Sequence, residues 1–310
     1  MNNRTRGVLE MSAAMAISGT IGWCVVHSAL PIVELIFWRC VFGAATLAPV
    51  CAALRMFRRE LWSWRLVGLA SLGGVAIVVN WLLIFASYSR ASISIATAVY
   101  NTQPFMLVGL GALFLGERLN ASKLSWLIVA FAGMLLIVQA EHGAGSHHAQ
   151  GSGAGADDYL FGILMALGAA FFYALAAFVT KKLAGTPPHL IALVQVCVGI
   201  LIVAPAVNFA ALPSLTGEAT AWATLAAMGV IYTGLVYILL YGAIQKLPTA
   251  LTGALSFIYP LVAIGVDYAA FGQRLQGAQI VGAAAILFGA AGMTLGWSWR
   301  SANAPINEAS

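Results

Sequence analysis

The chain has 310 residues, of which 61% are hydrophobic and only 8% are charged. A soluble domain carries about 25% charged residues, so this composition excludes an ordinary soluble protein and indicates one that lies in a lipid bilayer. The formal net charge of +5 does not indicate nucleic-acid binding, because the basic residues follow a membrane-topology pattern.

Apolar runs long enough to cross a bilayer follow one another along the chain. About 20 apolar residues in a helix span the hydrocarbon core, where every backbone polar group has to be paired inside the protein. The runs are continuous and not alternating, which excludes a transmembrane β-barrel. We therefore predict an all-α integral membrane protein with ten transmembrane helices, near residues 7–28, 32–54, 64–86, 92–115, 123–140, 159–181, 188–210, 220–242, 248–271 and 277–298.

The lysines and arginines gather on one side of these predicted spans. With a cytoplasmic N-terminus, the inner side carries Arg4, Arg6, Arg55, Arg58, Arg59, Arg65, Arg118, Lys123, Lys181, Lys182, Lys246 and Arg300. The outer side carries only Arg90 and Arg274, and Arg39 lies within a span. The positive-inside rule therefore predicts that both termini are cytoplasmic.

The sequence contains an internal repeat. An offset of 156 residues superposes Ala98 on Ala254, Pro104 on Pro260, Gly116 on Gly272, Arg118 on Arg274, Leu119 on Leu275 and Gly133 on Gly289. Five spans in each copy is an odd number, so the two copies have opposite orientations, as in many secondary transporters. We expect a first five-helix repeat at 1–140, a linker at 141–158, a second five-helix repeat at 159–300 and a cytoplasmic tail at 301–310. The repeat also argues against a cleaved signal peptide at 7–28, because the first span has to match the sixth.

The linker 141–158 is rich in glycine, alanine and serine and is expected to be flexible on the outer side. Its glycine spacing is not a dinucleotide fingerprint, because no strand precedes it. A metal site at His142, His147 and His148 is the alternative to solvated linker histidines, which we favour. We expect no metal, no cofactor and no catalytic residue.

Spans four and nine place polar and aromatic side chains one turn before a proline, about halfway across the membrane. Interrupted helices at corresponding positions of two repeats indicate a substrate site, and the alternative is that the prolines only bend the helices. We predict that the substrate-binding residues are Trp23, Asn80, Tyr100, Asn101, Gln103, Tyr173, Tyr232, Ser256 and Tyr259, with Pro104 and Pro260 as kinks or hinges. Aromatic and amide side chains suit a molecule with an apolar body and a polar head.

Ionisable residues inside spans are functional candidates, and Glu10, Glu34 and Arg39 are the possible coupling residues. Glu34 and Arg39 are about 140° apart on one helix, so they are not expected to pair. Arg39 is expected to bind helix-end carbonyls or another span. Spans four and nine have no carboxylate at mid-depth, which favours gradient-driven movement over obligatory proton antiport.

The chain resembles the drug/metabolite transporter superfamily, in its EamA-type branch. The resemblance rests on Ala86–Leu119 with the run Gly116-Glu117-Arg118-Leu119, on Phe37-Trp38-Arg39-Cys40 and on Gly242–Gly292. Gln273 departs from the glutamate that the family often has there. The resemblance implies an exporter with a cavity framed by spans one, three, four, six, eight and nine, and within the branch the chain is similar to bacterial aromatic amino-acid exporters of the YddG type.

We therefore expect a secondary transporter of the bacterial inner membrane that exports aromatic or neutral amino acids and related metabolites by alternating access. Export of lipophilic or cationic drugs, or of other metabolites, is the alternative. A membrane enzyme would need a nucleophile with its base, paired carboxylates or a metal cluster, and a channel would need a ring of repeated charges; neither pattern is visible. The expected partners are a small-molecule substrate and the lipid bilayer, without nucleic acid, for a monomer or weak dimer.

Overall fold

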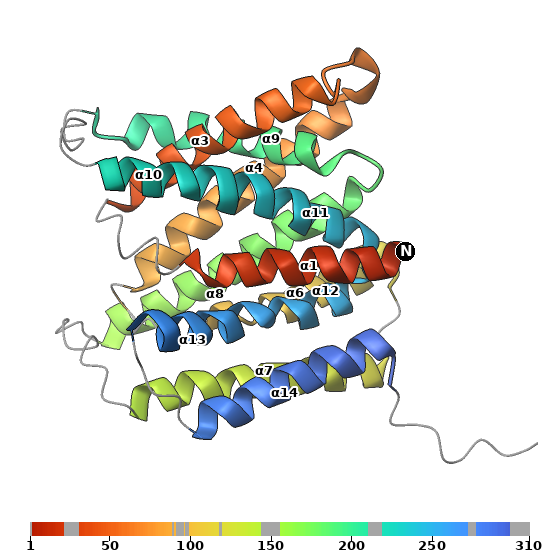
Figure 1. Cartoon of the computed structure of the whole chain (residues 1–310), viewed down its shortest axis with the longest axis vertical. Helices are drawn as coiled ribbons and strands as arrows, with labels where there is room; N and C mark the ends of the chain where they lie inside the picture. Colours follow the sequence, from red (N-terminus) through yellow and green to blue (C-terminus); the bar gives the residue numbers. More distant parts are fainter. Residues whose placement is uncertain are drawn as a thin grey trace, which may run out of the picture.

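The computed structural model of the protein describes residues 2–21, 31–88, 90, 96, 99–117, 120–143, 156–209, 219–271 and 277–297. All regular secondary structure in these ranges is helical, and the helices form one layered bundle (Figure 1). Trp23, most of the linker 141–158 and the tail 301–310 lie outside the described residues. The all-α prediction is confirmed for the described part of the chain.

The helices follow the predicted apolar runs. The first half contains α1 (Asn3–Gly19), α3 (Ile32–Ala53), α4 (Trp64–Tyr88), α6 (Gln103–Leu115) and α7 (Ala121–Gly143). The second half contains α8 (Ala156–Lys182), α9 (Pro188–Val203), α10 (Ala219–Ala227), the π-helix η5 (Met228–Leu235), α11 (Val236–Lys246), α12 (Thr249–Ser256), α13 (Ile258–Phe271) and α14 (Gly277–Leu295). Short 3-10 turns occur at Arg59–Leu61 and Ala204–Ala206. Within the described residues, five helical stretches are long and apolar enough to cross a membrane, and four shorter apolar helices accompany them.

Several helix starts repeat with the 156-residue offset of the sequence. Helix α3 begins directly after Pro31 and α9 directly after Pro187. Proline fixes φ near −65°, and both prolines are extended, with ψ of 151° and 128°, so each turns the chain into its helix in the same way. Helices α7 and α14 likewise begin at Ala121 and Gly277.

Both predicted proline-containing spans are broken, and at equivalent positions. Asn101 and Thr102 form a turn immediately before α6, two residues ahead of Pro104. Phe257 separates α12 from α13, three residues ahead of Pro260. Asn101 and Phe257 are 156 positions apart. Because proline has no N–H for the helical ladder, each span continues as a new helix instead of one straight rod.

Helices from the two halves of the chain pack against each other throughout the bundle. Helix α7 lies along α14, and α4 lies along α8 (Figure 1). Helix α3 contacts both α9 and η5, while α1 contacts α11 and α13. The two halves are therefore interleaved, and they share a large interface inside the bundle.

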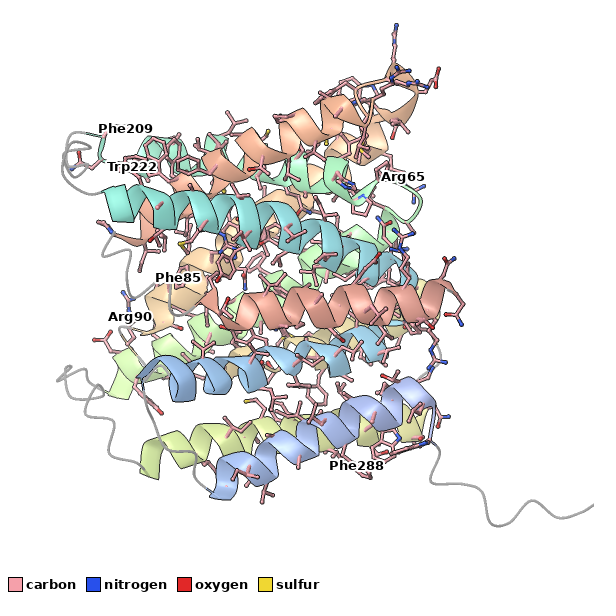
Figure 2. All side chains as sticks on the ribbon, viewed as in Figure 1. Arg65, Phe85, Arg90, Phe209, Trp222 and Phe288 are labelled. Carbon is pink, nitrogen blue, oxygen red and sulfur yellow. The ribbon has the colours of Figure 1, made fainter. Side chains whose placement is uncertain are left out.

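The outer surface of the bundle is apolar along the helices and charged at their ends. Leu113, Leu201 and Phe288 are 78%, 75% and 51% exposed, which is typical of side chains that face lipid. Arg65 and Arg90 lie at opposite ends of α4 (Figure 2). We call the side of the bundle where α1 begins, and where α8 and α11 end, the N-terminal face.

Candidate functional site

A small cavity lies in the middle of the bundle, between helices of both halves. Its volume is about 10 Å³, enough for about one water molecule. Its walls come from α1, α6, α8, α11 and α12, and the lining residues are Met11, Gln103, Pro104, Leu107, Tyr173, Ala177, Ile244, Thr252, Gly253 and Ser256. The space lies beside both helix breaks, where the sequence predicts a substrate site.

Gln103 gives the cavity its strongest polar character. It is the first residue of α6 and only 9% exposed, and its amide oxygen has no hydrogen-bond partner among the described residues. A buried amide group without a partner costs about 1–3 kcal/mol. Such a cost is typical of a group that is kept for a ligand or an ordered water molecule.

The α12 wall of the cavity is formed by backbone that packs closely on the other half. A Cβ atom added to Gly253 would lie 2.8 Å from Cβ of Pro104, so only glycine permits this approach. The Ser256 hydroxyl donates to the Gly253 carbonyl at 2.6 Å, and the Thr252 hydroxyl donates to the Pro248 carbonyl at 3.1 Å. The two broken helices therefore meet beside the cavity through a glycine–proline contact.

A second group of predicted residues joins the cavity through Tyr173. The rings of Tyr100 and Tyr173 meet edge to face, with centroids 6.2 Å apart. Asn80 donates from Nδ2 to the Tyr100 hydroxyl at 3.3 Å and to the Ala169 carbonyl at 2.7 Å. Its Oδ1 is buried and has no partner in the part of the chain that the structure describes. The structure thus brings Asn80, Tyr100, Gln103, Tyr173 and Ser256 into one continuous region.

The remaining predicted site residues are distributed differently. Tyr232 belongs to a separate cluster with Leu35, Leu225 and Met228, and its hydroxyl lies 2.6 Å from that of Thr20. Asn101 is 4% exposed and lies in the turn before α6. Tyr259 is partly buried in α13, on the far side of the second break.

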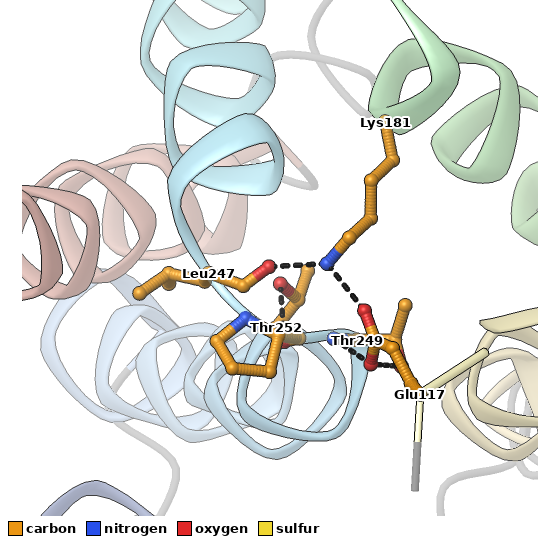
Figure 3. A network of polar contacts seen from close by, with 6 residues as sticks. Glu117, Lys181, Leu247, Thr249 and Thr252 are labelled. Carbon is orange, nitrogen blue, oxygen red and sulfur yellow. Dashed lines mark hydrogen bonds and ion pairs between the residues drawn. The ribbon is translucent and has the colours of Figure 1, made fainter. Parts of the chain in front are cut away.

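A network of ion pairs closes the bundle between the cavity and the N-terminal face. Lys181 at the end of α8 lies 2.7 Å from the Glu117 carboxylate and donates to the Leu247 carbonyl at 2.5 Å (Figure 3). Glu117 also accepts from the backbone N–H and the hydroxyl of Thr249, at 3.0 and 2.6 Å. We call this group of Glu117, Lys181, Leu247 and Thr249 the latch. It joins the end of α6 to the second half of the chain.

Two further ion pairs, which share Glu10, lie at the same face. Lys246 lies 2.5 Å from one carboxylate oxygen of Glu10, and Arg6 lies 2.9 Å from the other. Met11, the next residue after Glu10, lines the cavity, as does Ala177, one turn before Lys181. The charged contacts therefore lie about one helical turn from the cavity, where they hold α1 and α6 against α8, α11 and α12.

The latch changes the acidity of its carboxylate. Burial raises the pKa of Glu117, but hydrogen bonds from Lys181 and Thr249 and the charge of Lys181 outweigh it, so the pKa lies below the ordinary value of 4.5. The carboxylate is therefore ionised at neutral pH, as the ion pair requires.

Glu34 and Arg39, the ionisable pair of α3, do not contact each other, as their spacing predicts. Glu34 accepts from the backbone N–H of Asn208 at 3.3 Å. Arg39 binds the Tyr232 carbonyl and the Thr233 hydroxyl of η5, which confirms the expectation of a partner on another span. Among the described residues, no three His, Cys, Asp or Glu side chains come together in a way that could hold a metal ion.

The sequence matches the EamA-like transporter family twice, over residues 5–139 and 160–295. It is 31% identical over 288 residues to a Bacillus subtilis protein described as an uncharacterized transporter (YxxF), covering 93% of this chain and 89% of that protein. It is 27% identical to a probable amino-acid metabolite efflux pump of Escherichia coli, covering 67% and 69%. A shorter match of 111 residues, 31% identical, joins it to protein RarD of Streptomyces exfoliatus, covering 35% of each chain.

A similar fold is found among solved structures. One crystal structure superposes with a TM-score of 0.79 and covers 94% of this chain and 98% of its own. The sequences are 20% identical, so this likeness concerns the fold alone.

Proposed function

The chain belongs to the EamA-like transporter family and is a multi-pass membrane transporter, and we propose that it exports amino acids and related small metabolites by alternating access. The observation that carries the proposal is the buried amide oxygen of Gln103, which has no partner among the described residues and lines a cavity between two broken helices. A polar group without a partner at mid-bundle is expensive, and a polar substrate would satisfy it during transport.

We place the protein in the bacterial inner membrane, with ten spans in two inverted five-helix repeats and both termini in the cytoplasm. The equivalent helix starts and breaks at an offset of 156 residues support the two repeats. In Figure 1, α1 and α8, the first helices of the two halves, begin at opposite sides of the bundle, which supports the inversion. The N-terminal face would then be the cytoplasmic one.

The amino-acid substrate class rests on two supports. One relative is described as a probable amino-acid metabolite efflux pump. The cavity offers a neutral amide, two hydroxyl-bearing side chains of α12 and the Tyr173 ring beside aliphatic side chains, a combination that suits a molecule with an apolar body and a polar head. None of the described residues that line this cavity is a carboxylate, which makes a cationic drug the weaker alternative.

The mechanism that we propose starts from a state closed at the N-terminal face. The cavity has room for about one water molecule, so it has to widen before any substrate enters. Breaking the contacts of Lys181 with Glu117 and of Lys246 with Glu10 would let the two halves separate at this face. The breaks before Pro104 and Pro260 supply points at which the helices can bend. Transport of this kind needs no cofactor and no catalytic residue, and one chain contains the whole cavity.

Counterflow in liposomes tests the proposal. Purified protein is reconstituted, and exchange of radiolabelled phenylalanine, tryptophan, threonine and alanine is followed with and without a pH gradient. Saturable exchange of at least one of them that ignores the gradient is the expected result. Exchange that follows the gradient would direct attention to Glu10 and Glu34 as coupling residues, whereas no exchange of any of the four would refute amino-acid transport.

A further inference from the structure

Two aromatic side chains at equivalent repeat positions stack on each other inside the bundle. Trp81 and Tyr237 are 156 residues apart, and their rings stack with centroids 6.3 Å apart and planes tilted by 25°. Both side chains are buried. Their stack joins α4 of the first half to α11 of the second.

A polar side chain of α3 contacts the Trp81 ring, and the equivalent side chain of α9 contacts Tyr241, the neighbour of Tyr237. The guanidinium carbon of Arg39 lies 4.4 Å from the Trp81 ring centroid. The position 156 residues after Arg39 is Gln195, which accepts a hydrogen bond from the Tyr241 hydroxyl. The Tyr241 ring in turn stacks on Tyr237 with centroids 5.1 Å apart. The two halves thus build similar polar–aromatic groups, but only the first contains a charge.

Arg39 is a buried cation whose described partners are all neutral. Its side chain is 8% exposed, and Nε donates to the Thr233 hydroxyl at 2.8 Å. Nη2 reaches the Tyr232 carbonyl at 3.3 Å, and Nη1 donates to no described residue. The described ion pairs do not include Arg39. A charge inside the membrane costs several kcal/mol unless an anion accompanies it.

Gln195 shows that the fold does not need the charge at this position. The same place in the second half is filled by a neutral amide. The helix that carries this amide, α9, still packs tightly on α3, because a Cβ added to Gly199 would lie 2.8 Å from the Cys40 sulfur. The charge of Arg39 therefore has another use. A guanidinium with one free edge is the side chain best suited to hold a carboxylate.

We propose that Arg39 binds the carboxylate of the transported substrate, with Trp81 and Tyr237 against its apolar part. This inference rests on the proposed function and names the anionic group that the substrate carries. Tyr173, in the wall of the Gln103 cavity, packs on the same core cluster as Trp81 and Tyr237. The cavity has to widen to admit a substrate. If it widens from Tyr173 towards Trp81 and Tyr237, it reaches Arg39.

Equilibrium binding tests the inference without transport. The unfolding temperature of the purified protein in detergent is measured with 3-phenylpropionate and with its neutral amide, for the unchanged protein, Arg39→Gln, Arg39→Lys and Arg90→Gln. Arg39→Gln installs the residue of the second half, and Arg39→Lys keeps the charge without the planar fork. Arg90→Gln is the matched control, because Arg90 also contacts an aromatic ring, that of Phe161, at 5.6 Å.

The carboxylate is expected to stabilise the unchanged protein and Arg90→Gln, and the amide is not. Arg39→Gln should bind the carboxylate about tenfold to a hundredfold more weakly, since hydrogen bonds to charged groups are worth about 1.5–3 kcal/mol, and Arg39→Lys should fall between. Equal binding by Arg39→Gln and the unchanged protein, or no carboxylate binding by the unchanged protein, would overturn the inference. If chloride raises the unfolding temperature as much as the carboxylate does, and Arg39→Gln abolishes that rise, Arg39 holds an inorganic anion and the inference is likewise wrong.

Phenylalanine counterflow by the same proteins separates this inference from the proposed function. Carboxylate binding that depends on Arg39, in a protein that exchanges no amino acid, would leave the Arg39 site standing and refute amino-acid transport. If Arg39→Gln still exchanges phenylalanine with an unchanged half-saturation concentration, amino-acid transport stands and the Arg39 site is refuted.

Discussion

Gly133 of α7 and Gly282 of α14 face each other so closely that a Cβ atom on either would lie 2.5 Å from the carbonyl oxygen of the other. The equivalent contact, 156 residues away, joins Gly289 to Trp126, where a Cβ would lie 2.9 Å from the carbonyl oxygen. Small residues let membrane helices approach until their backbones touch. Helices α7 and α14 therefore touch through their backbones at two places, which are related by the 156-residue repeat.

Alanine at this crossing is expected to destabilise the protein. Gly133→Ala or Gly282→Ala should lower the unfolding free energy by about 1–3 kcal/mol, the usual cost of overpacking, because the obstacle is rigid backbone. Gly68→Ala is the control, since nothing lies within 4 Å of a Cβ there. Thermal unfolding in detergent measures the difference, and Gly133→Ala matching Gly68→Ala would contradict the crossing as described.

Replacing Gln103 by leucine is expected to separate stability from transport. The change removes a buried amide oxygen that has no partner among the described residues. The unfolding temperature should therefore stay the same or rise, while amino-acid exchange falls at least tenfold. Gln245→Leu is the opposite case, because its amide donates to the Leu183 and Thr186 carbonyls and its loss should lower the unfolding temperature. Full exchange by Gln103→Leu would show that the amide does not serve the substrate.

Breaking the latch is expected to open the N-terminal face. In Glu117→Gln or Lys181→Met, a cysteine placed at Ala177 should react with a thiol reagent about two to five times faster from that side, because a partly exposed ion pair contributes about 0.2–1 kcal/mol. The assay uses a background without the native cysteines. The double variant should react more slowly than the product of the two single effects predicts, since both single changes remove the contact between Glu117 and Lys181. Fully additive effects would mean that the two residues act separately.

The latch should also weaken in acid. The pKa of Glu117 is lowered in the closed state, so this state binds fewer protons than one in which the carboxylate faces water. Its contribution to closure is complete above the ordinary value of 4.5 and is lost as the pH falls through the lowered value. The cysteine at Ala177 should therefore become more reactive below that pH, after correction for thiolate content, and Glu117→Gln should abolish the change.

Removing the first proline tests the predicted hinge. Pro104→Ala restores a backbone N–H and favours a continuous helix through Asn101, so the maximal exchange rate should fall several-fold with an unchanged half-saturation concentration. Pro49→Ala is the matched control, because Pro49 lies inside unbroken α3. An unchanged rate in Pro104→Ala would mean that the proline only shapes the cavity.

The sequence alone was enough to predict the helical class and much of the polar cavity wall. Gln103, Tyr173 and Ser256 could be predicted because polar and aromatic side chains at mid-depth are costly in a membrane and therefore selective signals. Met11, Leu107 and Ile244 also line the cavity but carry no such signal. In a sequence, an apolar residue that lines a cavity cannot be told from one that packs against lipid.

Contacts between residues far apart in the chain could not be predicted from the sequence. Glu117 and Lys181 occur near span ends, where charges are expected for topology alone, and only folding shows that they meet. Tyr232 was predicted as a substrate-binding residue, but its neighbours were not, because the face of a helix that meets a given partner depends on packing between helices. The π-helix that carries Tyr232 was not predicted either.

The position equivalent to Glu117 in the other copy is Gln273, which has no charge, so that copy cannot form the ion pair of the latch. A carrier that is held more firmly shut on one side spends more of its time open to the other side. The apparent affinity for a ligand is the intrinsic affinity multiplied by the fraction of molecules whose site is open to that ligand. The two sides of the membrane would then show different half-saturation concentrations for one substrate, lower on the side away from the latch. Net flux would still stop when the concentrations are equal, so the imbalance sets how sensitive each side is and leaves the end point of transport unchanged.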